Sequence, residues 1–114
     1  MLIDASNLDK WVFEKVQEFF EKALNDTELN ERLHQSHNVF FLHLLGLDTN
    51  GHANLPHSKE YIDNILYVDN GVKEIVKLVE SFFPDGKTSY VFTADHGMND
   101  RGIFKSSKRK EKNK

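Results

Sequence analysis

The chain has 114 residues, of which 39% are apolar and 11% aromatic, values typical of one small globular domain. It contains no cysteine, which excludes disulfides, thiolate zinc sites and cysteine nucleophiles, so any metal must be held by histidine, aspartate or glutamate. No apolar run approaches the ~20 residues that span a bilayer, and the N-terminal MLIDASNLDK lacks the basic and apolar regions of a signal peptide. We therefore expect a soluble chain with no membrane segment.

The formal net charge of −3 conceals an uneven distribution along the chain. Residues 1–100 hold 8 lysines and arginines and 17 acidic residues, whereas residues 101–114 hold 7 lysines and arginines and 1 acidic residue. We expect residues 103–114 to form a disordered basic tail, because they combine high charge with few apolar groups. Their KRK sequence leaves a nuclear signal or a nucleic-acid contact open, but a solubilising terminus is the expected role, and no nucleic-acid partner is expected.

Two helices are predicted in the first third of the chain. Apolar side chains recur at intervals of three and four residues and predict a helix near residues 7–24, with a capping box that starts at Ser6. A short second helix near residues 27–34 is indicated by Asp26 or Thr27 as its N-cap. Aromatic side chains of the first helix are expected in the core: Trp11, Phe19 and Phe20.

The middle of the chain predicts strand, loop, helix and strand in that order. The run NVFFLHLLGLD, residues 38–48, has no alternation, which is typical of a strand buried on both faces, and His43 within it is expected to be a core histidine. Residues 48–57 are predicted to form a loop from their Asn, Gly and Pro content. A long helix follows at about 58–82 with Ser58 as its N-cap, and SYVFTA is the second strand.

The order strand, long helix, strand predicts a βαβ unit of parallel strands with flanking helices, and therefore an α/β fold. Asp48 and His52 follow the first strand, and Asp95 and His96 follow the second. Because the carboxyl ends of parallel strands meet at one edge of a sheet, we expect these four side chains to lie together. Two parallel strands are too few for a stable sheet, so we expect further strands from a larger domain or a partner.

Aspartate and neutral histidine are good ligands for zinc or manganese, and two such metals can clamp both oxygens of an in-line phosphoryl transfer. The four side chains could supply half the ligands of each of two metals. The spacing alone leaves another interpretation open, in which residues 48–52 form a hydrogen-bonded turn and residues 95–97 a strand-exit turn. Asn50 and Asn99 flank the motifs and could support the ligands or serve as turn residues.

Three stretches, FLHLLGLDTNGHANLPHS, VDNGVKEIV and VFTADHGMND, resemble the alkaline phosphatase superfamily and, more closely, the phosphoethanolamine transferases of GPI-anchor biosynthesis. The resemblance covers residues 1–102. It implies a partial alkaline-phosphatase-like core in which Asp48 and His52 are ligands of one divalent metal, and Asp95 and His96 are ligands of the other. Zinc is the expected metal at both positions.

The resemblance also implies an activity, the transfer of phosphoethanolamine onto the first mannose of the GPI-anchor precursor. The partners of the full enzyme would be the GPI-precursor glycolipid and phosphatidylethanolamine. Its location would be the endoplasmic reticulum membrane, with the catalytic domain in the lumen. Another phosphodiesterase or sulfatase of the same superfamily is an alternative, although the LDTNGH sequence favours the GPI enzyme.

The departures from the family pattern concern both sides of the matching region. The family's nucleophilic threonine and first metal-binding aspartate have no counterpart here, and Thr49 and Thr93 are not assigned that role. The Gly-His that completes the first metal site is also unmatched after Asp100. We therefore expect residues 1–102 to be a fragment of the catalytic domain, without a catalytic residue and inactive alone. A non-enzymatic interaction module, using exposed sheet edges and the basic tail, is the alternative from a different class.

Overall fold

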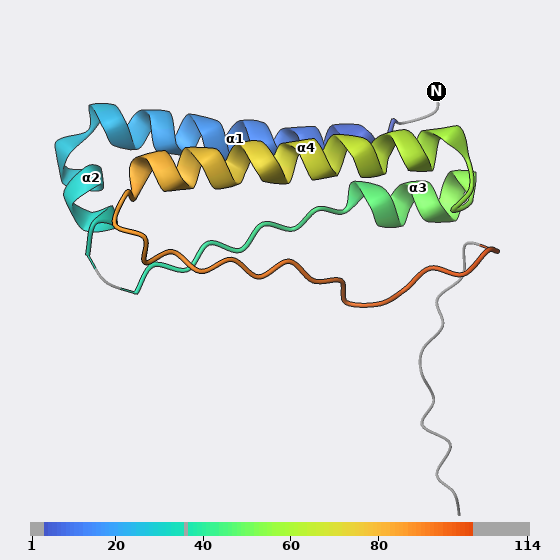
Figure 1. Ribbon diagram of the computed structural model, residues 1–114. Coiled ribbons are helices and arrows are strands. Elements are labelled where there is room, and N and C mark those ends of the chain that lie inside the picture. The colour runs from blue at the N-terminus through green and yellow to red at the C-terminus, as the bar shows by residue number, and fades with distance from the viewer. Residues whose placement is uncertain (1–3, 36, 102–114) are drawn as a thin grey trace, which may run out of the picture.

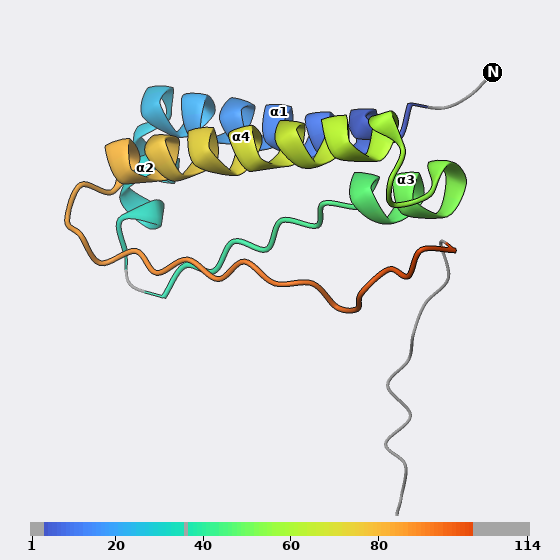
Figure 2. The same cartoon turned by 45° about the vertical axis from the view of Figure 1, so that its right-hand side comes forward.

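The structure, a computed structural model, describes residues 4–35 and 37–101. The long helices α1 and α4 lie side by side, with α2 at one end of the pair and α3 at the other (Figure 1). On the side of α2 and α3, two extended segments, residues 37–45 and 87–94, run in the same direction (Figures 1 and 2). The helices are α1 (Ser6–Asn25), α2 (Thr27–Leu33), α3 (Gly46–Asn54) and α4 (Lys59–Phe82).

The main apolar core lies where α1, α2 and α4 meet. The buried rings of Phe20 and Phe82 pack edge to face there, with their centroids 4.9 Å apart. Burial of such side chains contributes about 1.5–3 kcal/mol each, so this cluster stabilises the pairing of the long helices. Further buried members of the cluster are Ala23, Leu33 and Val79.

Two of the predicted helix starts are confirmed by their caps. Asp26 accepts the backbone N–H of Leu29 at the start of α2, and Ser58 accepts that of Tyr61 at the start of α4. The capping box predicted from Ser6 is wrong, because α1 begins without a side-chain cap. Asp9, the acidic residue of that box, is buried instead and accepts the backbone N–H of Gly46 at the start of α3.

The predicted α/β fold with a βαβ unit is wrong for the described chain, because neither expected strand forms. Residues 37–45 and 87–94 are extended, but no backbone hydrogen bond joins these two segments. The helices cover one side of them (Figure 2), and the side chains of Phe41 and Val91 are 86% and 88% exposed. A doubly buried strand needs neighbours and cover on both faces, and this arrangement provides neither. The sheet edges required by an interaction module are thus absent from the described residues.

The core positions expected for Trp11 and His43 are also wrong. Trp11 is 61% exposed and His43 is exposed, and both line an open apolar groove between α1 and residues 40–45. Both expectations assumed that side chains would cover the apolar run from two sides. With helices on one side only, these residues stay at the surface.

The predicted basic tail, residues 103–114, lies outside the described residues. Within the part of the chain that the structure describes, no helix is long and apolar enough to cross a bilayer. The candidate site residues lie on helix α3 and just after the extended segment 87–94.

Candidate metal centre

The stretch predicted as a loop, residues 48–57, is instead largely helix α3. The N-terminal backbone N–H of this helix, from Gly46, is donated to Oδ1 of Asp9 on α1 at 2.9 Å. Asn and Gly are poor helix formers, but this cap comes from a residue 37 positions upstream and stabilises the helix start. Because Asp48 and His52 are four residues apart on α3, they lie on the same face.

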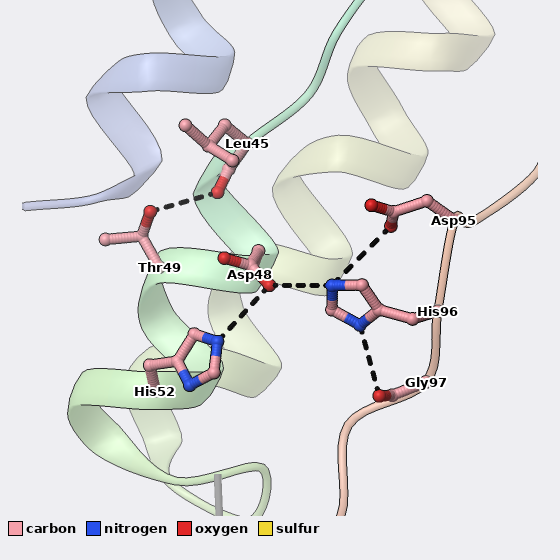
Figure 3. Close-up of polar contacts among 7 residues, drawn as sticks. All are labelled: Leu45, Asp48, Thr49, His52, Asp95, His96 and Gly97. Carbon is pink, nitrogen blue, oxygen red and sulfur yellow. Dashed lines mark hydrogen bonds and ion pairs between the residues drawn. The ribbon is translucent and has the colours of Figure 1, made fainter. Parts of the chain in front are cut away.

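Asp48 and His52 meet a histidine from a distant part of the chain (Figure 3). Nε2 of His52 lies 3.5 Å from Oδ1 of Asp48, and Nε2 of His96 lies 3.4 Å from the same oxygen. His96 Nε2 also lies 3.8 Å from Oδ1 of the adjacent Asp95. The four residues predicted as metal ligands are thus brought together, as expected, although no sheet carries them. Their role as ligands stays a prediction.

The backbone beside His96 orients its ring. Nδ1 lies 3.2 Å from the carbonyl oxygen of Gly97 (Figure 3), and a carbonyl only accepts, so Nδ1 carries the proton in this contact. In the neutral ring the lone pair is then on Nε2, the atom that faces Asp48. A neutral imidazole with one nitrogen held by a carbonyl and the other directed into a site is the form that binds metals.

Oδ1 of Asp48 is a buried acceptor, and buried acceptors normally receive a hydrogen bond. No donor within the described residues forms a hydrogen bond to it. A buried acceptor without a donor costs about 1–3 kcal/mol. A divalent cation near this oxygen and the imidazole nitrogens would offset that cost, and zinc accepts this combination of ligand atoms. The chemistry of the residues present therefore fits a metal.

The number of converging ligands is smaller than a complete site needs. Among residues 4–35 and 37–101, no group of three or more histidine, aspartate or glutamate side chains is arranged to hold a metal ion. Catalytic zinc sites take three protein ligands and structural ones take four. Each of the predicted ligand pairs, Asp48 with His52 and Asp95 with His96, is smaller than either of these ligand sets, so further ligands would be needed.

A glycine on α3 lets the segment around His96 approach the helix. A Cβ atom on Gly51 would lie 2.8 Å from Cε of Met98 and 3.3 Å from the ring of Tyr61. The missing side chain leaves room for Met98 to pack on α3, two residues after His96. Gly51 thus leaves space beside α3 for Met98, which follows closely after His96 in the chain.

The threonine hydroxyls next to the motifs are engaged with the backbone. Thr49 donates to the carbonyl of Leu45 at 3.2 Å, on the opposite side of α3 from His96 (Figure 3). Thr93 donates to the carbonyl of Ala94 at 3.3 Å. That neither threonine is the nucleophile stays a prediction.

Sequence reasoning did not single out the buried polar residues behind α3. Asp9 and Asn64 are fully or almost fully buried, each four residues before a buried apolar side chain, Phe13 and Val68. A polar residue in register with a buried apolar stripe was the signal that could have found them. Asn50 is buried inside α3, so the turn interpretation of this residue is wrong.

The chain matches the model of one known protein family. Residues 3–106 match the family model described as Type I phosphodiesterase / nucleotide pyrophosphatase. This match covers most of the chain, and the chain belongs to that family. No solved structure matches it.

Curated relatives narrow this class to proteins named GPI ethanolamine phosphate transferase 1. The chain is 63% identical to the one from Aspergillus oryzae over 99 residues, which are 87% of this chain and 10% of the relative. It is 56% identical to the Mus musculus protein and 53% to the Homo sapiens protein, each over 100 residues, 87% of this chain and 11% of the relative. The resemblance inferred from the motifs is thus confirmed. The chain spans about a tenth of the length of the curated relatives it matches.

Proposed function

We propose that the chain is part of a metal-dependent transferase that moves phosphoethanolamine onto a GPI-anchor precursor. Support comes from its family membership and from the relatives, which carry a phosphoethanolamine transferase name. The first mannose of the precursor is the proposed acceptor, and phosphatidylethanolamine is the proposed donor. The proposed location is the endoplasmic reticulum membrane, with the site facing the lumen.

The proposed role of the chain is to contribute ligands to two divalent metals, zinc in both cases. Asp48 and His52 would hold one metal, and Asp95 and His96 would hold the other. Metals in such a pair supply positive charge that polarises a phosphoryl oxygen. The chain's own residues hold that charge in place: α3 sets the direction of its two ligands, and the Gly97 carbonyl orients the ring of His96.

The observation that carries the proposal is the buried Oδ1 of Asp48, which lies within 3.5 Å of two imidazole nitrogens and receives no hydrogen bond among the described residues. In a purely structural motif, such an acceptor would be expected to have a donor. A cation held by Asp48 and His52, next to a second cation held by Asp95 and His96, would supply the partner that this oxygen lacks. The nucleophile and the remaining ligands would come from residues outside this chain.

Zinc titration of the 114-residue chain tests the metal sites. The imidazole NMR signals of His52 and His96 should shift as Zn²⁺ is added. Those of His34 should stay, because its Nδ1 is 2.9 Å from the Asn30 carbonyl, away from the centre. Binding should be weak, since two ligands rarely hold a metal that takes three or four. Equal shifts at all histidines, or none, would remove the support for the metal sites.

A chimera tests the activity. In the Aspergillus oryzae relative, the matched 99-residue segment is replaced by the corresponding segment of this chain, and surface display of GPI-anchored proteins is measured. The chimera should support display, His96→Ala should abolish it, and His57→Ala, at an exposed histidine, should not. A chimera that is expressed but inactive would count against the function.

The chain alone should not hydrolyse an aryl phosphate, an aryl sulfate or a phosphodiester. Turnover by the purified chain that a chelator abolishes would show that no further residues are needed, and the preferred substrate would then identify another member of the superfamily.

A further inference from the structure

A buried chain of hydrogen bonds crosses the contact between α1, α3 and α4. Asp9 accepts the backbone N–H of Gly46 at 2.9 Å and an amide N–H of Asn64 at 2.8 Å. Asn64 accepts from the amide of Asn50 at 2.6 Å, and Asn50 accepts from the amide of Asn54 at 2.9 Å. We call Asp9, Asn64, Asn50 and Asn54 the amide relay.

The carboxylate of Asp9 sets the direction of every bond in the amide relay. A carboxylate oxygen only accepts, so Asn64 must turn its NH₂ group toward Asp9 and its oxygen toward Asn50. Asn50 must then use its NH₂ group for Asn64 and its oxygen for Asn54. A buried network in which the members satisfy one another is rigid, whereas loss of one member leaves buried groups without partners.

The amide relay holds α3 by the face opposite to the candidate ligands. Successive residues of an α-helix are rotated by about 100° around its axis. Asn50 is two residues from both Asp48 and His52, so it is rotated by about 200° from each and lies on the opposite face. Gly46, whose N–H is bound by Asp9, likewise lies about 200° from Asp48. Fixing this inner face fixes the rotation of α3, and therefore the direction in which Asp48 and His52 point.

We propose that Asp9, Asn64 and Asn50 are positioning residues of the metal centre, which act through α3 and not by contact with a metal. This inference rests on the proposed function, because it assigns the relay to the same site. It requires that loosening the relay disturbs Asp48, His52 and His96 more than an equal loss of stability elsewhere in the fold does.

The test compares Asn64→Ala with Asn70→Ala, an identical change on the same helix at an exposed asparagine outside the relay. Asn64→Ala should weaken Zn²⁺ binding to the 114-residue chain by about tenfold or more, the usual effect of losing a residue that orients a ligand. Asn70→Ala should leave zinc binding unchanged. Unchanged binding in Asn64→Ala, with folding confirmed by circular dichroism, would overturn the proposal.

A second control shows whether Asn64→Ala lowers zinc affinity through the position of the ligands or only through a loss of overall stability. Val79→Ala shortens a buried side chain in the main core, near the opposite end of α4 from Asn64. At a temperature where the variants are folded, it should keep the zinc affinity of the parent chain. An equal loss of affinity in Val79→Ala would show that stability alone matters, and Asn50→Ala takes the place of Asn64→Ala if that variant does not fold.

A metal-free measurement keeps the two proposals apart. Without zinc, Asn64→Ala should shift the imidazole signals of His52 and His96, and Asn70→Ala should not. If the parent chain binds no zinc but these shifts occur, the metal sites fail while the positioning role stands. If the parent chain binds zinc and Asn64→Ala changes neither the shifts nor the affinity, the positioning role fails alone.

Discussion

The ring of Phe13 on α1 lies directly against the backbone of Gly71 on α4. A Cβ atom on Gly71 would come within 2.1 Å of Cε2 of this ring, and Phe13 is itself buried. The glycine, which weakens an isolated helix, therefore allows the two long helices to pack. The ring of Tyr67, whose centroid is 6.0 Å away, borders the same contact.

Gly71→Ala should lower the free energy of unfolding, measured by urea denaturation and circular dichroism. Overpacking of this kind costs about 1–3 kcal/mol, more than the ~1 kcal/mol that alanine gains over glycine in an open helix. Gly97→Ala is the matched control, because a Cβ there meets nothing within 4 Å, and its effect should stay within about 0.5 kcal/mol. A more stable Gly71→Ala variant would show that the contact is not close.

Gly51→Ala should displace Met98 and weaken the approach of His96 to Asp48. The zinc-dependent shift of the His96 ring is the measurement, and it should shrink while the helix content stays. The added methyl group needs the space that Cε of Met98 occupies, so the double variant with Met98→Ala should recover part of the shift. If the double variant behaves like Gly51→Ala alone, the effect does not pass through Met98.

Asp48→Asn should remove zinc binding without lowering the stability of the metal-free chain. The change keeps the shape of the side chain, removes its charge and replaces one carboxylate oxygen by an NH₂ group, which can donate to a neighbouring imidazole nitrogen. We expect an equal or higher Tm without metal, and no increase when zinc is added, because residues kept for function often lower stability. Asp69→Asn, at an exposed carboxylate of α4, should leave the zinc response intact. A large drop in Tm would indicate a structural role for Asp48.

The hydroxyl of Tyr90 donates to Oε1 of Glu80 at 3.1 Å and connects residues 87–94 to α4. Partial burial, followed by the Glu80 carboxylate, raises the pKa of Tyr90 above its ordinary value of about 10. The folded chain holds this proton more tightly than the unfolded chain. The resulting stability is therefore complete below about pH 10 and is lost as the pH rises through the raised pKa.

Urea denaturation of the parent chain and of Tyr90→Phe at several pH values measures this contribution. The parent should be more stable at about pH 8, and the difference should close at alkaline pH once Tyr90 ionises. Glu80→Gln keeps a hydrogen-bond acceptor without the charge and should move the closure to lower pH. A difference that does not depend on pH would exclude ionisation of Tyr90 as its cause.

The helices were predictable because their signals are local. Asp26 and Ser58 each cap a helix within three residues, and the apolar side chains of α1 and α4 recur at helical intervals. The strands were not predictable from residues 38–48 alone, because a strand requires partners elsewhere. An apolar run indicates that its side chains favour burial. It does not show whether the chain contains the further strands and helices needed to cover those side chains on both faces.

The sequence predicted which four residues form the candidate site, but not the helix that carries two of them. The four candidate ligands meet as expected, since both extended segments run the same way from the α2 end of the molecule toward α3 (Figure 1). Helix α3 was missed because its cap, Asp9, lies far away in sequence. The spacing of Asp48 and His52, four residues apart, was a local sign of that helix.

The position of Asn50 also affects how the protein ages. Asn50 precedes Gly51, the sequence context in which an asparagine most readily loses ammonia after attack by the next backbone nitrogen. In α3 that nitrogen belongs to a helical backbone, and the side-chain amide is buried and bound to Asn64, so the folded chain hinders the reaction. In an unfolded chain, loss of ammonia and opening of the resulting ring by water would convert Asn50 to aspartate or isoaspartate, whose carboxylate cannot donate to the oxygen of Asn64. Deamidation during an unfolded interval would therefore leave a molecule that can no longer rebuild its amide relay.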